Sequence, residues 1–139
     1  MTTIPFGAQL VGRTEKALNA LLERSLSGTG LTEPQWVALT LTMTAEGADP
    51  AARVAHALRV DEPTARRRLA ELATAGLVQP APGGVLEPTA LGRILWNNVR
   101  AETATIADSL WGNLPEGDRE AAARVLNAVL ARADAALAP

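Results

Sequence analysis

The chain has 139 residues and a formal net charge of −2, with 47% hydrophobic and 20% charged residues. This length is usual for a single domain, and the composition is typical of a folded globular protein rather than a disordered one. The sequence contains no cysteine and a single histidine, His56. Disulfides, thiolate zinc sites, cysteine nucleophiles and multi-histidine metal sites within one chain are therefore excluded.

The N-terminus reads MTTIPFGAQLVGRTEKAL and lacks the basic and then apolar layout of a signal peptide. No apolar run approaches the ~20 residues that a membrane-spanning helix needs. We therefore expect a cytoplasmic protein that has no contact with a membrane.

The first helix is predicted over residues 6–26, where leucines recur mostly at helical spacing before two glycines end the pattern. The second helix follows Thr32, which forms the T-x-x-Q pattern of a capping box with Gln35. Pro34 suits the first turn of this helix. Together these signals place the start of the second helix at Thr32.

Residues 49–60 and 61–76 predict two short helices separated by a tight turn. Asp49 is expected to cap the first of them and Asp61 the second, because aspartate oxygens accept hydrogen bonds from free backbone N–H groups. Gly76 stands where a glycine commonly ends a helix. The two helices therefore have clear start and stop signals.

The segment LVQPAPGGVLEP after Gly76 predicts a short hairpin around a Gly-Gly turn. A long helix from Thr89 to about Trp111 and a last helix over residues 116–137 follow. A short helix, a tight turn, a second helix and a two-stranded ribbon are the layout of a winged helix-turn-helix. We therefore expect an all-α fold with a small β-hairpin wing.

Three consecutive arginines, Arg66, Arg67 and Arg68, lie in the second helix of this motif. At about 100° per residue, with the apolar residues turned inward, Arg67 points outward and the other two fall on its flanks. Thr64 completes the exposed face. Long hydrogen-bond donors surrounded by small residues suit a helix that enters the DNA major groove.

Positive charge is concentrated on the helix-turn-helix. Residues 53–68 contain five arginines and two acidic residues, a net charge of +3, whereas the rest of the chain carries −5. This segregation favours DNA contact over a solvated face on which Glu62 pairs with Arg66 four positions later. The residues predicted to contact DNA are Thr64, Arg66, Arg67, Arg68, Arg53 and Arg59.

Four segments in succession resemble MarR-type winged-helix transcriptional regulators: LTEPQWVALT, VAHALRV, DEPTARRRLAELATAGLV and PTALGRIL. The resemblance covers nearly the whole chain and implies one domain over residues 1–139. Within it, residues 1–30 and 90–139 would be dimerisation helices, and residues 31–89 would form the winged helix-turn-helix lobe. The resemblance also implies a homodimeric, ligand-responsive repressor that reads a pseudo-palindromic operator through residues 61–76.

The resemblance further implies a small aromatic or phenolic effector, bound between the dimerisation helices and the winged lobe. Three tryptophans could line its site, namely Trp36, Trp96 and Trp111, of which Trp36 is the best candidate and Trp96 the second residue that we expect there. Tryptophans at helical spacing are nevertheless more often simply core residues. Arg13, Lys16 or Arg100 could pair with an anionic group on the effector, although each is more often a surface or dimer-contact residue. The residues expected at the dimer interface are Leu10, Leu18, Val125, Val129 and Ala133.

Two features depart from the family's pattern. No arginine or lysine lies between Leu77 and Gly92, although the family's wing usually carries a basic residue. Arg68 and Arg59 stand where an apolar and a small residue are common, and their charges could compensate for the wing. The uncharged wing leaves a second function open: a winged-helix dimer with weak or no DNA binding that serves as a small-ligand-binding or protein-interaction module.

Signatures of catalysis are absent from the sequence. There is no glycine-rich phosphate loop, no G-x-S-x-G segment and no histidine spaced with carboxylates for metal binding. We therefore expect no enzymatic activity, no cofactor and no metal.

Overall fold

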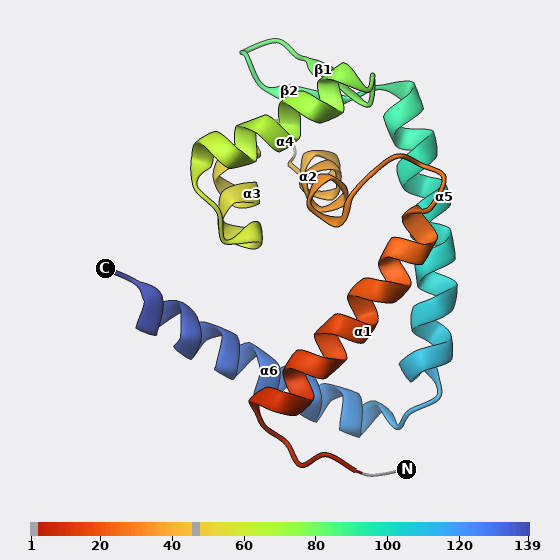
Figure 1. The fold of residues 1–139 in the computed structure, drawn as a ribbon, viewed down its shortest axis with the longest axis vertical. Helices are drawn as coiled ribbons and strands as arrows, with labels where there is room; N and C mark the ends of the chain where they lie inside the picture. The colour runs from red at the N-terminus through yellow and green to blue at the C-terminus, as the bar shows by residue number, and fades with distance from the viewer. Residues whose placement is uncertain (1–2, 46–47) are drawn as a thin grey trace. The chain divides into compact units, whose positions relative to one another are not determined.

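The structure of the protein, a computed structural model, describes residues 3–45 and 48–139. Within these residues the elements are α1 (Ala8–Leu26), α2 (Glu33–Met43), α3 (Ala51–Leu58), α4 (Glu62–Thr74), β1 (Val78–Pro80), β2 (Leu86–Pro88), α5 (Ala90–Ala107), a π-helical turn η1 (Asp108–Gly112) and α6 (Glu116–Leu137). The predicted fold class, all-α with one small hairpin, is confirmed. Figure 1 shows α4 leading into the hairpin and the hairpin leading into α5.

The chain divides into two compact units, Met1–Thr103 and Ala104–Pro139. The first unit contains the helix-turn-helix, the hairpin and most of α5. The second contains the last turn of α5, the π-helical turn and α6. The helix α5 therefore contributes residues to both units.

The predicted caps of α2 and α4 are confirmed. The Thr32 side chain accepts a hydrogen bond from the Gln35 backbone, and the Gln35 side chain accepts one from the Thr32 N–H at 3.0 Å. The Asp61 carboxylate accepts a hydrogen bond from the Thr64 N–H at 2.8 Å. These bonds satisfy N–H groups that a helix start otherwise leaves without partners.

The helix α3 begins slightly later than its predicted cap. Pro50 occupies the N-cap position, and Asp49 Oδ1 accepts a hydrogen bond from the Ala51 N–H at 3.1 Å. At its other end, Arg59 has a φ of 57° and a ψ of 45°, in the left-handed region. This conformation turns the chain directly into α4 but costs a non-glycine residue about 1–2 kcal/mol.

The core of the first unit lies between α2, α3, α4 and the hairpin. Leu39, Val54 and Leu72 are fully buried, and α4 contributes two more buried side chains, Ala65 and Leu69. Since this face of α4 is fixed against the core, its opposite face must point to solvent. The buried cluster comprises Ala38, Leu39, Ala51, Val54, Ala65, Leu69, Leu72, Leu77 and Val78.

The hairpin is short and antiparallel, with Gln79 opposite Glu87. Gly83 and Gly84 both have positive φ values, 88° and 81°, which lets the chain reverse over few residues. The predicted Gly-Gly turn is therefore confirmed.

Thr89 joins the hairpin to α5. Its hydroxyl donates a hydrogen bond to the Gly76 carbonyl at 2.6 Å and accepts one from the Gly92 N–H at 3.0 Å. Gly92 lies so close to Leu77 that a Cβ at position 92 would collide with the Leu77 carbonyl oxygen. This glycine is required by close approach, because it is buried at a contact between two backbones.

The second unit has little core of its own. No residue of α6 is buried within the described chain. Eight large apolar side chains of this second unit are 41% to 68% exposed. They are Leu110, Trp111, Leu114, Val125, Leu126, Val129, Leu130 and Leu137. An apolar helix face of this kind marks an interaction site. No helix in the described residues has the length and apolar character needed to cross a membrane.

Candidate nucleic-acid interface

The two helices α3 and α4 form the helix-turn-helix, and α4 presents a polar face to solvent. Leu69 and Leu72 fix its inner face in the core, while Arg66 and Arg67 are exposed on the other side. The predicted inner face of α4 is therefore confirmed. Its outer face is free to approach a large partner.

Arg67 makes one hydrogen bond with a neutral side chain. Its Nη2 donates to the Thr64 hydroxyl oxygen at 2.9 Å. Hydrogen bonds from Thr64 lower the pKa of Asp61, and the positive charge of Arg67 adds to that effect. Arg67 has no ion pair among the described residues, so its charge is open to a further ligand.

Arg66 contacts two carboxylates. Its Nη2 lies 2.7 Å from Glu62 Oε1 and 3.2 Å from Asp49 Oδ2. The hydrogen bonds to Glu62 and then to Asp49 raise the pKa of Arg66 above its usual value. The predicted alternative, a Glu62–Arg66 pair on a solvated face, is therefore present, and Asp49 adds a second acceptor that the sequence did not indicate.

Arg68, the other predicted flank of Arg67, is only partly open to solvent, and its contact with DNA stays a prediction. Its side chain is only 29% exposed, and its Nη1 pairs with Glu71 Oε1 at 3.2 Å. The same Glu71 oxygen accepts a hydrogen bond from Gln35 Nε2 at 3.1 Å. The Nε of Arg68 is buried and has no hydrogen-bond partner within the part of the chain that the structure describes. Glu71 therefore connects α4 to α2 through Gln35, and Arg68 pairs with the same carboxylate oxygen.

The other two predicted arginines belong to α3 and its end. Arg53 is exposed on α3, and Arg59 is exposed at the strained left-handed C-cap. A glycine would relieve that strain. An arginine at this turn therefore lowers stability locally while adding positive charge beside the start of α4.

The carboxylate partners reduce the positive charge of the motif. Residues 49–71 hold five arginines and four acidic residues, a net charge of +1. The hairpin adds no positive charge, since its single charged residue is Glu87. The Glu87 carboxylate accepts a hydrogen bond from Gln79 at 3.1 Å. The interface therefore depends on a few exposed cations rather than on a basic surface.

The two tryptophans predicted to line an effector site lie together. The Trp36 and Trp96 rings stack with centroids 6.4 Å apart and planes 22° apart. Trp96 Nε1 donates a hydrogen bond to the Thr40 hydroxyl at 3.0 Å, which fixes the ring. The cation beside them is Arg100, whose guanidinium carbon lies 4.9 Å from the Trp96 ring centroid. Arg13 is exposed on α1.

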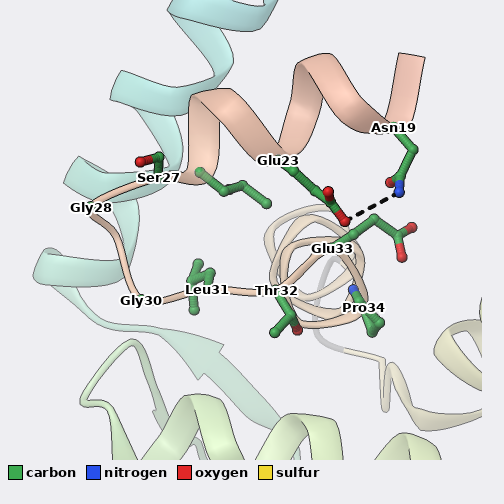
Figure 2. A pocket seen from close by; sticks show the side chains of 10 residues that line it. Asn19, Glu23, Ser27, Gly28, Gly30, Leu31, Thr32, Glu33 and Pro34 are labelled. Carbon is green, nitrogen blue, oxygen red and sulfur yellow. Dashed lines mark hydrogen bonds between the residues drawn. The ribbon is translucent and has the colours of Figure 1, made fainter. Parts of the chain in front are cut away.

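A separate pocket of about 440 Å³ lies where α1 leads into α2, and Figure 2 shows its side chains. Sequence reasoning did not predict it. Burial raises the pKa of Glu33 at its edge, and the negative charges of Glu15 and Glu23 raise it further. These acids disfavour an anionic ligand here. The lining residues are Asn19, Glu23, Leu26, Ser27, Gly28, Gly30, Leu31, Thr32, Glu33 and Pro34.

No protein-family model matches the chain, and no curated protein matches its sequence. Solved structures do match. The transcriptional regulator PA3341 is 25% identical with a TM-score of 0.76, and the match covers 93% of this chain and 98% of that one. The oxidised form of MarR from E. coli is also 25% identical, with a TM-score of 0.68 and coverages of 93% and 96%.

A third structure shows a relative with a ligand. It is the MarR family protein Rv2887 of Mycobacterium tuberculosis in complex with p-aminosalicylic acid. It is 24% identical with a TM-score of 0.68, and the match covers 91% of this chain and 98% of that one.

The chain therefore has the winged helix-turn-helix fold of MarR-family transcriptional regulators, and the resemblance carried by its four sequence segments is confirmed. The proteins that share this fold with the chain are transcriptional regulators and not enzymes. In this fold α4 is the second helix of the helix-turn-helix, and the hairpin is the wing.

Proposed function

We propose that the protein is a homodimeric repressor that binds a pseudo-palindromic DNA operator by placing α4 in the major groove. The observation that carries the proposal is the position of Arg67, which is exposed opposite the buried face of α4 and whose side chain, among the described residues, is hydrogen-bonded to Thr64 and to no carboxylate. An arginine in this state can bind guanine edges or phosphates with its planar fork of donors. Exposed Arg53 and Arg59 would add phosphate contacts.

A homodimer would bury apolar side chains that a single chain leaves in water. In this proposal residues 1–30 and 90–139 form the dimerisation helices, and residues 31–89 form the DNA-binding lobe. Two copies of α4 would then read half-sites one duplex turn apart, roughly 34 Å. The side chains proposed at the interface are Leu10, Leu18, Val125, Val129 and Ala133.

Fluorescence anisotropy with two labelled duplexes tests DNA binding. One duplex comes from the DNA that flanks the protein's own gene, the other has a random sequence, and both are titrated at two salt concentrations. We expect a clear preference of the wild type for the flanking DNA. Arg67→Ala should weaken that binding about 10- to 100-fold, the usual effect of losing one bidentate base contact.

Arg124→Ala is the matched control, because Arg124 is an exposed arginine on α6 and its removal changes the net charge equally. Its affinity should stay close to that of the wild type. Equal affinity of the wild type for both duplexes at low salt would contradict the proposal. So would an Arg67→Ala variant that binds as well as Arg124→Ala.

The uncharged wing favours a second candidate function. Residues 77–92 contain no arginine or lysine, and two of the three arginines of α4 are paired with carboxylates. A winged-helix dimer that binds a small ligand or another protein without DNA would share these features. It would be dimeric in solution and would show no preference between the two duplexes.

The proposed effector is a small aromatic or phenolic acid bound beside Trp36 and Trp96. The stacked rings offer aromatic surface, and the Arg100 guanidinium against Trp96 can pair with a carboxylate. The complex of Rv2887 with p-aminosalicylic acid supports this class of ligand. The acidic pocket between α1 and α2 suits it less, because its carboxylates would repel the ligand.

Titration with p-aminosalicylic acid, followed by tryptophan fluorescence and by release of labelled DNA, tests the effector site. We expect quenching and DNA release in the wild type and a large loss of both in Arg100→Ala. Trp111→Phe should keep both responses, because Trp111 belongs to the other unit. Quenching that is unchanged in Trp36→Phe and Arg100→Ala would place the ligand elsewhere.

A further inference from the structure

Arg66 is surrounded by more negative than positive charge. Glu62 lies one turn before it on α4, whereas Asp49 precedes α3 and is 17 residues away in sequence. A single guanidinium nitrogen contacts both carboxylates. The side chains of Arg66, Asp49 and Glu62 are 55%, 53% and 52% exposed. The cluster is therefore a surface feature with a net charge of −1.

A DNA phosphate would compete for the same donor. Phosphate and carboxylate oxygens are both anionic acceptors that a guanidinium binds through charge-assisted hydrogen bonds. In this structure two carboxylates already occupy the side chain. Arg66 therefore cannot bind a phosphate through Nη2 without giving up at least part of this pairing.

We propose that Asp49 and Glu62 act as internal substitutes for DNA phosphates, which keep Arg66 away from DNA of arbitrary sequence and release it on the operator. This inference rests on the proposed binding of DNA through α4. It assigns to two acidic residues a role in specificity, which depends on weakening wrong complexes as well as on strengthening the right one.

The physical basis is the difference between the two binding modes. Non-operator binding is almost entirely an attraction between cations and phosphates, and its strength follows the number of phosphates neutralised. A paired Arg66 adds nothing to that number, and the net negative cluster repels the duplex. On the operator, base contacts hold α4 close to the groove. A nearby phosphate can then displace exposed ion pairs, which are weak and screened by water.

Amide substitutions separate charge from structure at both acids. Asp49 uses Oδ1 to accept a hydrogen bond from the Ala51 N–H and Oδ2 to accept one from Arg66. An asparagine keeps an oxygen for Ala51 and loses the charge. A glutamine at position 62 keeps the length of the side chain and one acceptor for Arg66. The variants should therefore fold as the wild type does.

The experiment compares the full-length wild type with Asp49→Asn, Glu62→Gln and the double variant. Each is titrated with the flanking and the random duplex over a salt series. The double variant should bind the random duplex about tenfold more tightly at low salt. Its logarithmic salt slope should steepen by about 2, the effect of one additional phosphate contact in each subunit of the proposed dimer. Binding to the flanking duplex should rise less, so the preference falls.

The matched control is the double variant Asp118→Asn with Glu120→Gln on α6. It removes the same two negative charges from another exposed helix. It should leave the salt slope and the preference unchanged. Thermal unfolding of each variant shows whether the lobe keeps its stability.

The outcomes separate the inference from the function on which it rests. In one outcome the wild type prefers the flanking DNA while the Asp49/Glu62 double variant binds the random duplex no more tightly than the control does. That result overturns the inference alone. Loss of operator binding in Glu62→Gln also overturns it, because Glu62 would then contact a base, such as the cytosine amino group. A wild type that binds neither duplex overturns both.

Discussion

The helix-turn-helix lobe and the C-terminal unit are stabilised in opposite ways. In the lobe, Leu39, Val54 and Leu72 are fully buried, and side chains cap the starts of α2 and α4. In the unit Ala104–Pro139, α6 has no buried residue within the described chain, and Val129 and Leu130 are about half exposed. The lobe therefore has its own core, whereas α6 leaves its apolar face exposed in the single chain.

This difference matches the two kinds of partner that we propose. The lobe presents polar, charged side chains over a rigid core, which suits a nucleic acid whose contacts depend on position. The C-terminal unit presents apolar side chains with few polar ones between them, which suits a second copy of the chain. Mutations in the two regions should therefore have different dependences on protein concentration.

The largest effect is expected for Leu72→Ala, which should cost about 2–5 kcal/mol of unfolding free energy, because Leu72 is fully buried. Urea unfolding measures it. Leu130→Ala on α6 is the counterpart, since Leu130 is 52% exposed in the single chain. Its cost should be small in dilute protein and should grow with concentration. An equal loss of unfolding free energy in both variants, independent of protein concentration, would contradict the difference between the lobe and the C-terminal unit.

Val129→Asp should weaken self-association about 10- to 100-fold, or about 1.4–2.7 kcal/mol, because it places a charge on the apolar face of α6. Sedimentation velocity over a concentration series measures the change. Ala131→Asp is the control, since Ala131 lies about 200° away around the helix and is also exposed. Unchanged association in Val129→Asp would exclude this face from the dimer.

Gly92→Ala should destabilise the lobe by about 1–2 kcal/mol, because the new Cβ collides with the Leu77 carbonyl oxygen despite alanine's better helix propensity. The matched variant is Gly12→Ala on α1, where nothing lies within 4 Å of the added Cβ. It should stabilise the protein by about 0.5–1 kcal/mol. The melting temperature should fall in Gly92→Ala and rise in Gly12→Ala. Shifts of the same sign in both variants would contradict the close contact between Gly92 and Leu77.

The smallest effect concerns Glu33 in the first turn of α2. Burial, and then the charges of Glu15 and Glu23, raise the pKa of Glu33 above 4.5. The free energy of unfolding therefore falls as the pH rises through the pKa of Glu33 in the folded state. Glu33→Gln should stabilise the protein at pH 7 by a few tenths of a kcal/mol, because Glu33 is only partly buried and water screens its charge.

Below pH 4 the stabilisation by Glu33→Gln should disappear, since both states then hold the proton. Glu116→Gln is the counterpart in the first turn of α6, where the carboxylate is exposed. It should be neutral or slightly destabilising at pH 7, because a negative charge at a helix start is favourable. Unfolding midpoints of both variants, measured at pH 7 and below pH 4, show whether each substitution stabilises or destabilises the protein.

Local sequence signals predicted most of the fold. Thr32, Asp61 and Gly76 mark helix ends through interactions within a few residues, so their spacing is visible in the sequence. The exposure of Arg67 followed from the helical repeat in the same way. Whether Arg67 contacts DNA stays a prediction.

The interactions that sequence reasoning missed join distant positions. Arg68 turns toward Glu71, which is held by Gln35, 36 residues earlier, and no local pattern indicates this link. Asp49 reaches Arg66 across 17 residues in the same way. The pocket beside Glu33 likewise requires the packing of α1 against α2. A helical wheel gives the direction of a side chain but not the neighbour that it meets.

The hydrogen bonds of Thr89 connect the helix-turn-helix to α5. The Thr89 hydroxyl is hydrogen-bonded to the Gly76 carbonyl just after α4 and to the Gly92 N–H in α5, so it links the end of α4 to the first turn of α5. Trp96 lies about one turn beyond Gly92 on the same helix. We therefore expect a ligand bound beside Trp96 to act on a helix whose first turn is tied to the end of α4, a connection to the helix-turn-helix that needs no contact with the wing.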